Sequence, residues 1–551
     1  MLREMVLSDV VKIFHTVKYL RFKQVLYRFL TKINKPKVNT SLDLSLTTPA
    51  WRFDSPFAYR QSMFEDGSVL FLSKRVFSDS NTIWNDAAQD KLWLYNLHYF
   101  DDLNSFGFES RHSLHKLMMS RWIDENPPCI GNGWEPYPLS LRLVNWVKWL
   151  SKQGQVSHKF LASIVEQANA LTQQLEFHIL GNHLFANAKA LTFVGCYLDS
   201  NEGKQFLDLG LKILDQEIEE QFLVDGAHFE LSPMYHQILL WDLLDLINLG
   251  QVSRCPEVLQ RLPNWVSVAK KALFWLQSML HPDRDISFFN DSAHGIAANP
   301  KVIFEYANHL GIDFDVEFDL ITTHELSGYS RIQMANYTVL FDHANVGPDY
   351  LPGHAHADTL SFELSIGKQR VFVNSGTSLY GVSAERLRQR QTAAHNTVSV
   401  TNLDSSQVWS GFRVAKRAYA KLHKTSREGQ KVEIVASHDG YMKQRPKVTH
   451  TRSLDCTPER VIISDALSKA VPACFHLHIH PEVDVINLSE KEVSIMINGE
   501  LLCVLASSEP IAIKDSTWHP EFGKTIANKK IEINFANGNL KTEITKIKRE
   551  S

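Results

Sequence analysis

The sequence has few cysteines and no regular spacing among them. No CxxC pair occurs among the six, which are Cys129, Cys196, Cys255, Cys456, Cys474 and Cys503. Cysteine zinc sites and the disulfide frameworks of small secreted proteins both need closely and regularly spaced cysteines. We therefore expect reduced, mostly buried thiols rather than a disulfide scaffold or a cysteine-bound metal.

A long apolar run is also missing. No stretch of 18 apolar residues occurs, and charged residues interrupt the first dozen positions before an apolar segment of signal-peptide length builds up. A membrane-spanning helix needs about 20 predominantly apolar residues. We therefore expect a cytoplasmic protein without a transmembrane segment.

The chain as a whole has no strong excess of either charge. Its 58 lysines and arginines against 61 aspartates and glutamates give a formal net charge of -3. Because nucleic-acid-binding proteins usually carry a basic excess on one face, the composition gives no support for nucleic acid as a partner. With 551 residues, of which 44% are hydrophobic, the chain is long enough for two or three domains.

The first forty residues depart from this even balance. Only Glu4 and Asp9 are acidic there, and apolar residues such as Val10, Phe14 and Val17 alternate with the basic ones. The basic residues from position 10 onward are Lys12, Lys18, Arg21, Lys23, Arg28, Lys32, Lys35 and Lys37. The pattern predicts an amphipathic helix, and two interpretations stay open. The helix either makes a peripheral contact with an anionic membrane or a partner, or packs on its own domain with a solvated basic face.

The spacing of apolar residues changes once along the chain. From about residue 92 to residue 310 it is helical, and after about residue 325 it alternates with a period of two, as in the segment 359–367. We predict a multidomain α+β protein, with a basic leader and lead-in segment at residues 1–80. A helical domain is expected over 81–318 and a domain of antiparallel sheets over 319–551.

The densest polar cluster is Gly353-His-Ala-His-Ala-Asp358. If the following strand extends back this far, His354, His356 and Asp358 share its covered face and point toward the helical domain. Imidazole is a good base near neutral pH and a common metal ligand, although a hydrogen-bonded structural pair is an alternative. His356 and His395 at strand ends would suit zinc if further ligands exist.

Two helix starts in the first half carry polar groups. Ser232 and Pro233 suit the N-cap and first position of a helix, so Tyr235 is expected in its first turn. Asn182 is expected at the start of another helix. A helix N-terminus favours an anion such as a sugar carboxylate, whereas a cap and a packed aromatic residue are the ordinary alternatives.

Taken together, five segments in this order resemble the heparinase II/III and alginate lyase superfamily of polysaccharide lyases. They are GNHLFAN at 181–187, ELSPMYH at 230–236, GHAHADTLSFEL at 353–364, NSGT at 374–377 and AAHNTV at 393–398. The similarity runs from about Asn96 to about Val400. The stretch 21–28 also resembles the leader of bacterial members found beside exopolysaccharide genes. The resemblance implies an (α/α) toroid followed by an antiparallel β-sandwich domain.

The resemblance also implies β-elimination at a uronic acid. Asn182 would hold the substrate carboxylate and stabilise the carbanion-like state. Tyr235 would protonate the departing O4, and His354 matches the catalytic histidine; either Tyr235 or a histidine would be the base, according to the stereochemistry at C5. Candidate substrate-binding residues are His98, Glu135, His183, Tyr380 and Arg390.

A metal site, most simply for zinc, is implied at His356, Asn374 and His395. Many relatives have Asp where this chain has Asn374, and a neutral amide is a poorer zinc ligand. We expect a lyase acting on an acidic polysaccharide, in exopolysaccharide or capsule metabolism. The alternatives are a non-catalytic glycan-binding or assembly protein and a hydrolase. A hydrolase would need two opposed carboxylates from Glu135, Glu230 and Asp291.

Overall fold

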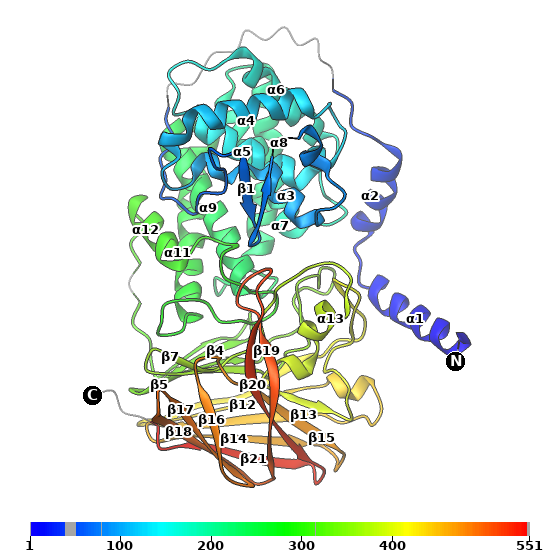
Figure 1. Ribbon diagram of the computed structural model, residues 1–551, viewed down its shortest axis with the longest axis vertical. Coiled ribbons are helices and arrows are strands. Elements are labelled where there is room, and N and C mark those ends of the chain that lie inside the picture. The colour runs from blue at the N-terminus through cyan, green and yellow to red at the C-terminus, as the bar shows by residue number, and fades with distance from the viewer. Residues whose placement is uncertain (1, 39–50, 79, 315, 548–551) are drawn as a thin grey trace.

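The computed structural model describes residues 2–38, 51–78, 80–314 and 316–547, with side chains from residue 10 onward. A helical domain is stacked on a domain of β-sheets, and two leader helices lie to one side of both (Figure 1). The leader helices are α1 (Leu2–Val17) and α2 (Phe22–Ile33). A small hairpin, β1 (Ser68–Phe71) with β2 (Lys74–Phe77), leads into the helical domain.

The helical domain contains helices of very different burial. They are α3 (Lys91–Tyr99), α4 (His112–Glu125), α5 (Pro136–Leu150), α6 (His158–Thr172), α7 (Gly181–Tyr197), α8 (Asn201–Gln221), α9 (Pro233–Ser253), α10 (Pro256–Leu259), α11 (Leu262–Ser278) and α12 (Pro300–His309). Nearly every side chain of α7 and α9 is buried, whereas α8 exposes one face. Helices that are apolar on all sides belong in the interior, so α7 and α9 form the centre of this domain. Short 3-10 helices at 81–85, 101–104, 108–111 and 132–134 connect the first of them.

The second domain contains antiparallel sheets of five, eight and four strands. The first has the order β3 (Ile321–His324), β4 (Tyr329–Gln333), β5 (Tyr337–Asp342), β6 (Phe362–Ile366), β7 (Gln369–Phe372). The second has the order β11 (Ala420–Glu428), β12 (Lys431–His438), β13 (His450–Thr457), β14 (Arg460–Leu467), β21 (Asn539–Thr545), β18 (Glu500–Ser507), β17 (Glu492–Ile497), β16 (Asp484–Ser489). The third has the order β19 (Ile511–Trp518), β20 (Ile526–Phe535), β15 (Ala473–His478), β8 (Val398–Val400). One apolar core joins all three sheets.

The connections between sheets carry smaller elements on the side facing the helical domain (Figure 1). Helix α13 (Ala384–Arg390) lies there, with a short ribbon of β9 (Val408–Trp409) and β10 (Arg413–Val414) and a 3-10 turn at 392–394. A further 3-10 turn at 440–443 follows β12. The predicted fold class, helices first and antiparallel sheets second, is confirmed.

The strand predicted at 359–367 does not extend back to the histidines, so the condition for their sharing its covered face is not met. Strand β6 begins only at Phe362, and residues 353–361 form turns. Leu360 has a φ of 66°, in the left-handed region, so the side-chain alternation of a strand stops there. His354 and His356 therefore do not share a sheet face with Phe362, and another feature of the structure must bring them together.

Candidate active site

Asp291 lies at the centre of a buried ionic cluster between the two domains. It belongs to the loop between α11 and α12, and its side chain is fully buried. Its Oδ2 is 2.9 Å from Nδ1 of His354, and its Oδ1 is 2.8 Å from Nε2 of His356. Arg386 of α13 forms a two-pronged ion pair with the same carboxylate. Burial alone would raise the pKa of Asp291, but Arg386 and the two histidines hold that pKa well below its usual value.

This carboxylate fixes the protonation pattern of His354. Because ionised Asp291 can only accept, Nδ1 of His354 carries a proton, and in the neutral ring the lone pair is therefore on Nε2. The Nε2 atom points toward Glu230, whose Oε2 is 3.9 Å away. The His354 side chain is 14% exposed, whereas the His356 side chain is fully buried. His354 therefore presents a basic nitrogen at the edge of the cluster.

Tyr235 packs face to face on His354, with ring centroids 3.8 Å apart. As the sequence predicted, it lies in the first turn of α9, where Ser232 caps the helix and accepts a hydrogen bond from the Tyr235 amide. Its hydroxyl is 3.0 Å from that of Tyr380. Burial and the neighbouring Tyr380 raise the pKa of Tyr235 well above its usual value. The phenol is thus protonated at neutral pH and is able to donate.

Asn182 lies at the start of α7, opposite Glu230. The chain turns sharply there, since Leu180 and Gly181 both have positive φ values. A Cβ on Gly181 would lie 2.5 Å from Cδ2 of Leu351 and 3.1 Å from Oε1 of Glu230, so only glycine allows this approach. Glu230 is buried, and neither of its carboxylate oxygens accepts a hydrogen bond within the described residues. Burial raises the pKa of Glu230.

His183 flanks this position from the next residue of α7. Its ring stacks on Tyr137 at 4.3 Å between centroids, and its Nδ1 is 2.9 Å from Oε1 of Glu176. Burial lowers the pKa of His183, but the adjacent Glu176 carboxylate outweighs it and raises the pKa overall. The imidazole is therefore a candidate for a cationic contact to an acidic ligand.

His356 and His395 lie together, and the third predicted ligand, Asn374, is bonded to the backbone amide of Asn396; it offers zinc a neutral amide, which is a poorer ligand than a carboxylate. Nδ1 of His356 is 3.2 Å from Nε2 of His395, within hydrogen-bond distance. The Asn374 carbonyl already accepts from the Ser361 hydroxyl and the Asn396 amide, and its Nδ2 is buried without a partner. Among the described residues, no group of three or more His, Cys, Asp or Glu side chains is arranged to hold a metal. No chemical step is therefore assigned to a metal.

Three other predicted substrate-binding residues have protein partners of their own. His98 is fully buried, with both ring nitrogens bonded inside the helical domain, and burial lowers its pKa to about 3. Arg390 is fully buried and donates to the backbone carbonyls of Ala355 and Ser410, so it supports the histidine segment. Glu135 is partly exposed and bonded to Tyr95 and Lys91. Tyr380 and His183, by contrast, border the cluster.

Two contributions to the cluster were not evident in the sequence. Arg386 was missed because a basic stretch such as RLRQR indicates only a charged helix face. Asp291 was considered only as one of two opposed hydrolase carboxylates. In the structure Asp291 and Glu230 approach the same imidazole, and Asp291 is tied to Arg386. The hydrolase interpretation therefore has no pair of free carboxylates facing each other here.

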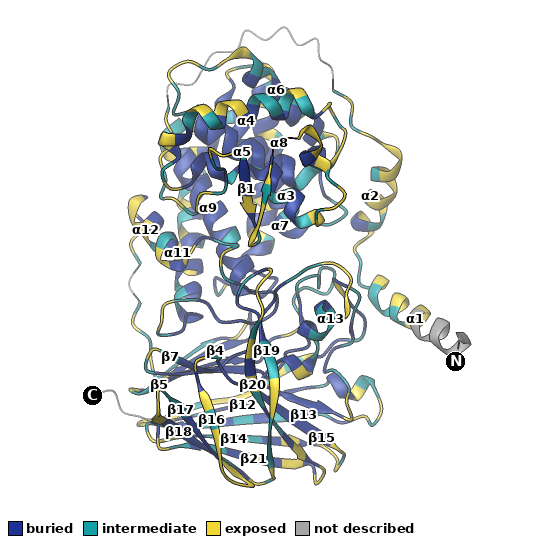
Figure 2. Cartoon of the chain, in the orientation of Figure 1, coloured by how far each residue is buried: buried dark blue, intermediate teal, exposed yellow. Residues whose placement is uncertain are grey.

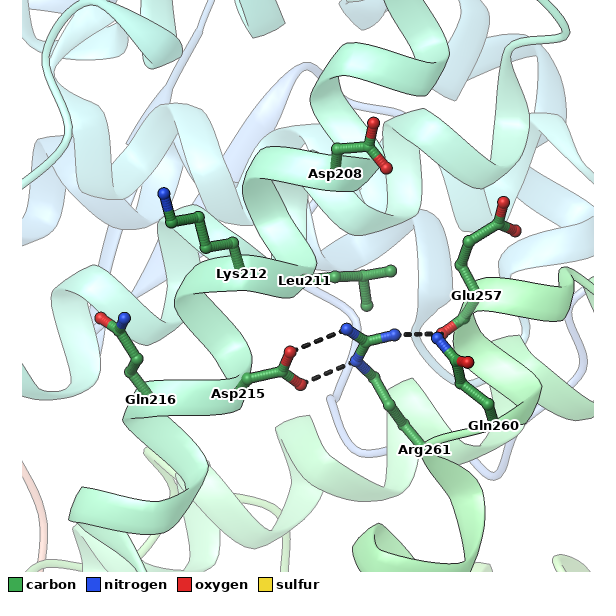
Figure 3. A pocket seen from close by; sticks show the side chains of 8 residues that line it. All are labelled: Asp208, Leu211, Lys212, Asp215, Gln216, Glu257, Gln260 and Arg261. Atoms are coloured by element: carbon green, nitrogen blue, oxygen red, sulfur yellow. Dashed lines mark hydrogen bonds and ion pairs between the residues drawn. The ribbon is translucent and has the colours of Figure 1, made fainter.

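A surface depression elsewhere carries no comparable chemistry. It lies between α8 and the α10–α11 corner, where Arg261 forms a two-pronged ion pair with Asp215 (Figure 3). No histidine or tyrosine is among the residues that line it. The candidate site is therefore the cluster between the domains.

Comparison with known families agrees with this arrangement. Residues 144–310 match the family model of the heparinase II/III N-terminus, and residues 323–547 match that of the heparinase II/III-like C-terminal domain. The chain therefore belongs to the heparinase II/III-like family, as the motifs predicted.

The individual relatives share only about a quarter of their aligned residues with this chain. A heparin-sulfate lyase from Bacteroides thetaiotaomicron is 24% identical over 373 residues, and one from Pedobacter heparinus is 25% identical over 316 residues. The alignments take in 58% and 51% of this chain, and 51% and 47% of those proteins. The chain thus spans about half the length of the curated relatives it matches.

Solved structures show the same fold. A crystal structure of heparinase III is similar with a TM-score of 0.68 at 16% identity, over 96% of this chain and 90% of that one. A heparan sulfate lyase from Pedobacter heparinus gives a TM-score of 0.56 at 16% identity, over 96% and 88%. At such identities the likeness establishes the fold and not the activity.

Proposed function

We propose that this protein is a polysaccharide lyase that cleaves a uronic-acid-containing polysaccharide by β-elimination. The observation that carries the proposal is the stacked pair of His354 and Tyr235 beside Asp291. In its neutral form the imidazole presents Nε2 as a base, and the tyrosine has a protonated hydroxyl. A base and an acid in contact are what an elimination needs.

The proposed reaction follows from these positions. Asn182, at the positive end of α7, binds the uronate carboxylate and stabilises the negative charge that spreads into it. Nε2 of His354 removes the proton from C5, and that electron pair forms the double bond between C4 and C5. The bond from C4 to the bridging oxygen breaks, and the Tyr235 hydroxyl protonates that oxygen. For the opposite configuration at C5, Tyr235 is the alternative base.

The substrate class is proposed from the named relatives and from the resemblance of the leader segment. Two relatives are named heparin-sulfate lyases, which supports an acidic polysaccharide as the substrate. The stretch 21–28 resembles the leader of proteins encoded beside exopolysaccharide genes. We therefore propose that the protein acts in exopolysaccharide or capsule metabolism, on an acidic polymer made by the same cell.

The test is the formation of an unsaturated uronate. Purified full-length protein is incubated with sulfated and unsulfated uronate polymers and with the acidic polysaccharide of its own producer, and products are followed by ultraviolet absorbance and mass spectrometry. Loss of one acid–base group is expected to lower kcat by about 10²–10⁴-fold in Tyr235→Phe and in His354→Gln. Tyr337→Phe removes another buried hydroxyl, bonded to Thr457 in the sheet domain, and serves as the matched control.

A second candidate, a non-catalytic glycan-binding protein, is favoured by Asn374 at a position where many relatives have Asp. It predicts saturable glycan binding that survives Tyr235→Phe, without any cleaved product. Absence of unsaturated product from the whole panel, with binding retained, would replace the lyase proposal by this one.

A further inference from the structure

The two leader helices expose apolar residues on a scale not seen elsewhere in the described chain. Ten of its twenty-six exposed large apolar side chains lie between Val10 and Ile33. Phe22 is 79% exposed and Ile33 is 76% exposed. Figure 2 shows α2 largely in the colour of exposed residues, and the described part of α1 in the colours of exposed and intermediate residues, beside a buried interior. Contiguous exposed apolar surface of this kind marks an interaction site.

These side chains form one face on each helix. In α2, Phe22, Leu26, Phe29 and Ile33 recur at intervals of three and four residues, which places them on the same side. All four are exposed. In α1 the same spacing joins four exposed residues, Val10, Ile13, Phe14 and Val17.

The opposite sides of the helices contact the protein, in α2 through the Tyr27 ring on Phe177 as well as through polar groups. Gln24 of α2 is buried and donates from Nε2 to the carbonyl of Tyr350 at 3.2 Å. In α1, the Thr16 hydroxyl accepts a hydrogen bond from the Trp409 indole at 3.1 Å and lies 3.3 Å from the carbonyl oxygen of Val414. A surface helix ordinarily buries its apolar face and exposes its polar one. Here both helices have the reverse orientation, so their apolar faces are available to something else.

The charge around this surface has one sign. Residues 10–38 contain no aspartate or glutamate. They contain the basic residues Lys12, Lys18, Arg21, Lys23, Arg28, Lys32, Lys35 and Lys37. Arg21 is paired across to Glu220 of the helical domain. Exposed apolar faces surrounded by basic side chains are the pattern of a helix that lies in the headgroup region of an anionic bilayer.

We propose that α1 and α2 form a docking surface for an anionic lipid bilayer. Their apolar faces enter the interface, and exposed basic residues such as Arg28, Lys32 and Lys35 contact the negative headgroups. None of the helices among the described residues is both long and apolar enough to cross a membrane. A second copy is a poor occupant, because pairing this surface with itself would bring two sets of cations together.

The docking surface adjoins the loop that leads to the candidate active site. The Arg21 guanidinium lies 3.7 Å from the centre of the Tyr350 ring, and Gln24 binds the Tyr350 backbone. Tyr350 precedes His354 by four residues. Deleting the leader would therefore disturb the site loop, and point substitutions on the apolar faces are the cleaner test.

The experiment uses the full chain and vesicles of phosphatidylcholine with or without phosphatidylglycerol. We expect cosedimentation with the anionic vesicles at a lipid concentration at least about tenfold lower than with neutral vesicles, and weakening at high salt. Phe22→Ser combined with Phe29→Ser, and Lys32→Gln combined with Lys35→Gln, are each expected to weaken that binding about tenfold or more. Ile486→Ser with Leu488→Ser removes two half-exposed apolar residues of β16 and is expected to change nothing.

Thermal unfolding and lyase assays accompany these variants, since none of the altered residues touches the proposed site. Absence of vesicle binding, equal binding to neutral and anionic vesicles, or binding unchanged in the two leader variants would each overturn the proposal. So would a dimer in light scattering that only the Phe22/Phe29 variant dissociates, because the surface would then join two copies. The outcome is independent of the lyase proposal, since binding is measured without substrate.

Discussion

Oδ2 of Asp291 is 2.9 Å from Nδ1 of His354, and this contact decides which imidazole nitrogen is free to react. The carboxylate is buried and paired with Arg386, so it stays ionised and acts only as an acceptor. His354 consequently exposes Nε2 beside Tyr235. Asp291 is a positioning residue in the proposed reaction, since it acts through His354.

Removing this carboxylate should impair catalysis through the histidine. In Asp291→Asn the amide can donate to Nδ1 and favour the wrong tautomer, so we expect kcat to fall by about 10²–10⁴-fold with a smaller change in KM. The variant also leaves Arg386 buried without its partner, which is destabilising. Asp291→Asn with Arg386→Met removes both charges and keeps the test informative. Unchanged kcat in a folded double variant would rule out the positioning role.

Tyr380 should matter less than Tyr235. Its hydroxyl is 3.0 Å from that of Tyr235 and helps to orient it, but the Tyr380 ring lies farther from His354, at 5.8 Å between centroids. We expect Tyr380→Phe to lower kcat by about tenfold, as for the loss of one hydrogen bond of about 1.4 kcal/mol. Steady-state kinetics of both phenylalanine variants measure the difference. An equal loss in the two would make Tyr380 a candidate for the acid.

Asn374 should control metal binding at the histidine pair. In Asn374→Asp a carboxylate joins His356 and His395, giving the mixed donor set that zinc prefers. We expect about one zinc per chain in that variant by elemental analysis after dialysis, and much less in the unaltered protein. Equal and stoichiometric zinc in both proteins would mean that the amide suffices and that the pair is a metal site after all.

The protein should lose stability in acid through Asp465. This buried carboxylate binds His450 and Arg452, and Arg452 in turn donates to the carbonyls of Leu360 and Asn396, next to the site. Burial acts to raise the pKa of Asp465, but Arg452 and His450 lower it to about 2 from 3.8. A depressed folded-state pKa stabilises the protein above the unfolded-state value, and that contribution is lost as the pH falls from about 4 toward 2.

Urea unfolding between pH 2 and pH 6 measures this loss. We expect about 2 kcal/mol to disappear over that interval from this one group. In Asp465→Asn the loss should be absent, although the variant is less stable at every pH because Arg452 lacks its partner. If the free energy of unfolding fell as steeply with decreasing pH in the variant as in the unaltered protein, other carboxylates would be responsible for the acid sensitivity.

The sequence determined the kind of structure in each half and the position of the chemistry along the chain. Apolar spacing distinguished helices from strands because each has its own period, and Ser232 and Pro233 placed Tyr235 in a first helical turn. The ordered motifs identified the family and brought Asn182, Tyr235 and His354 forward as one set.

Only the tertiary structure decided which of these residues meet and what surrounds them. Asp291 and Arg386 are 95 positions apart and join because two domains pack together, which no local pattern records. Packing within each domain made His98 a core residue and Arg390 a support for backbone carbonyls. Periodicity shows that α2 has an apolar face. Whether that face points to the protein or to solvent depends on the contacts of the helix, here including the hydrogen bond of Gln24 to Tyr350, and those contacts exist only in the folded protein.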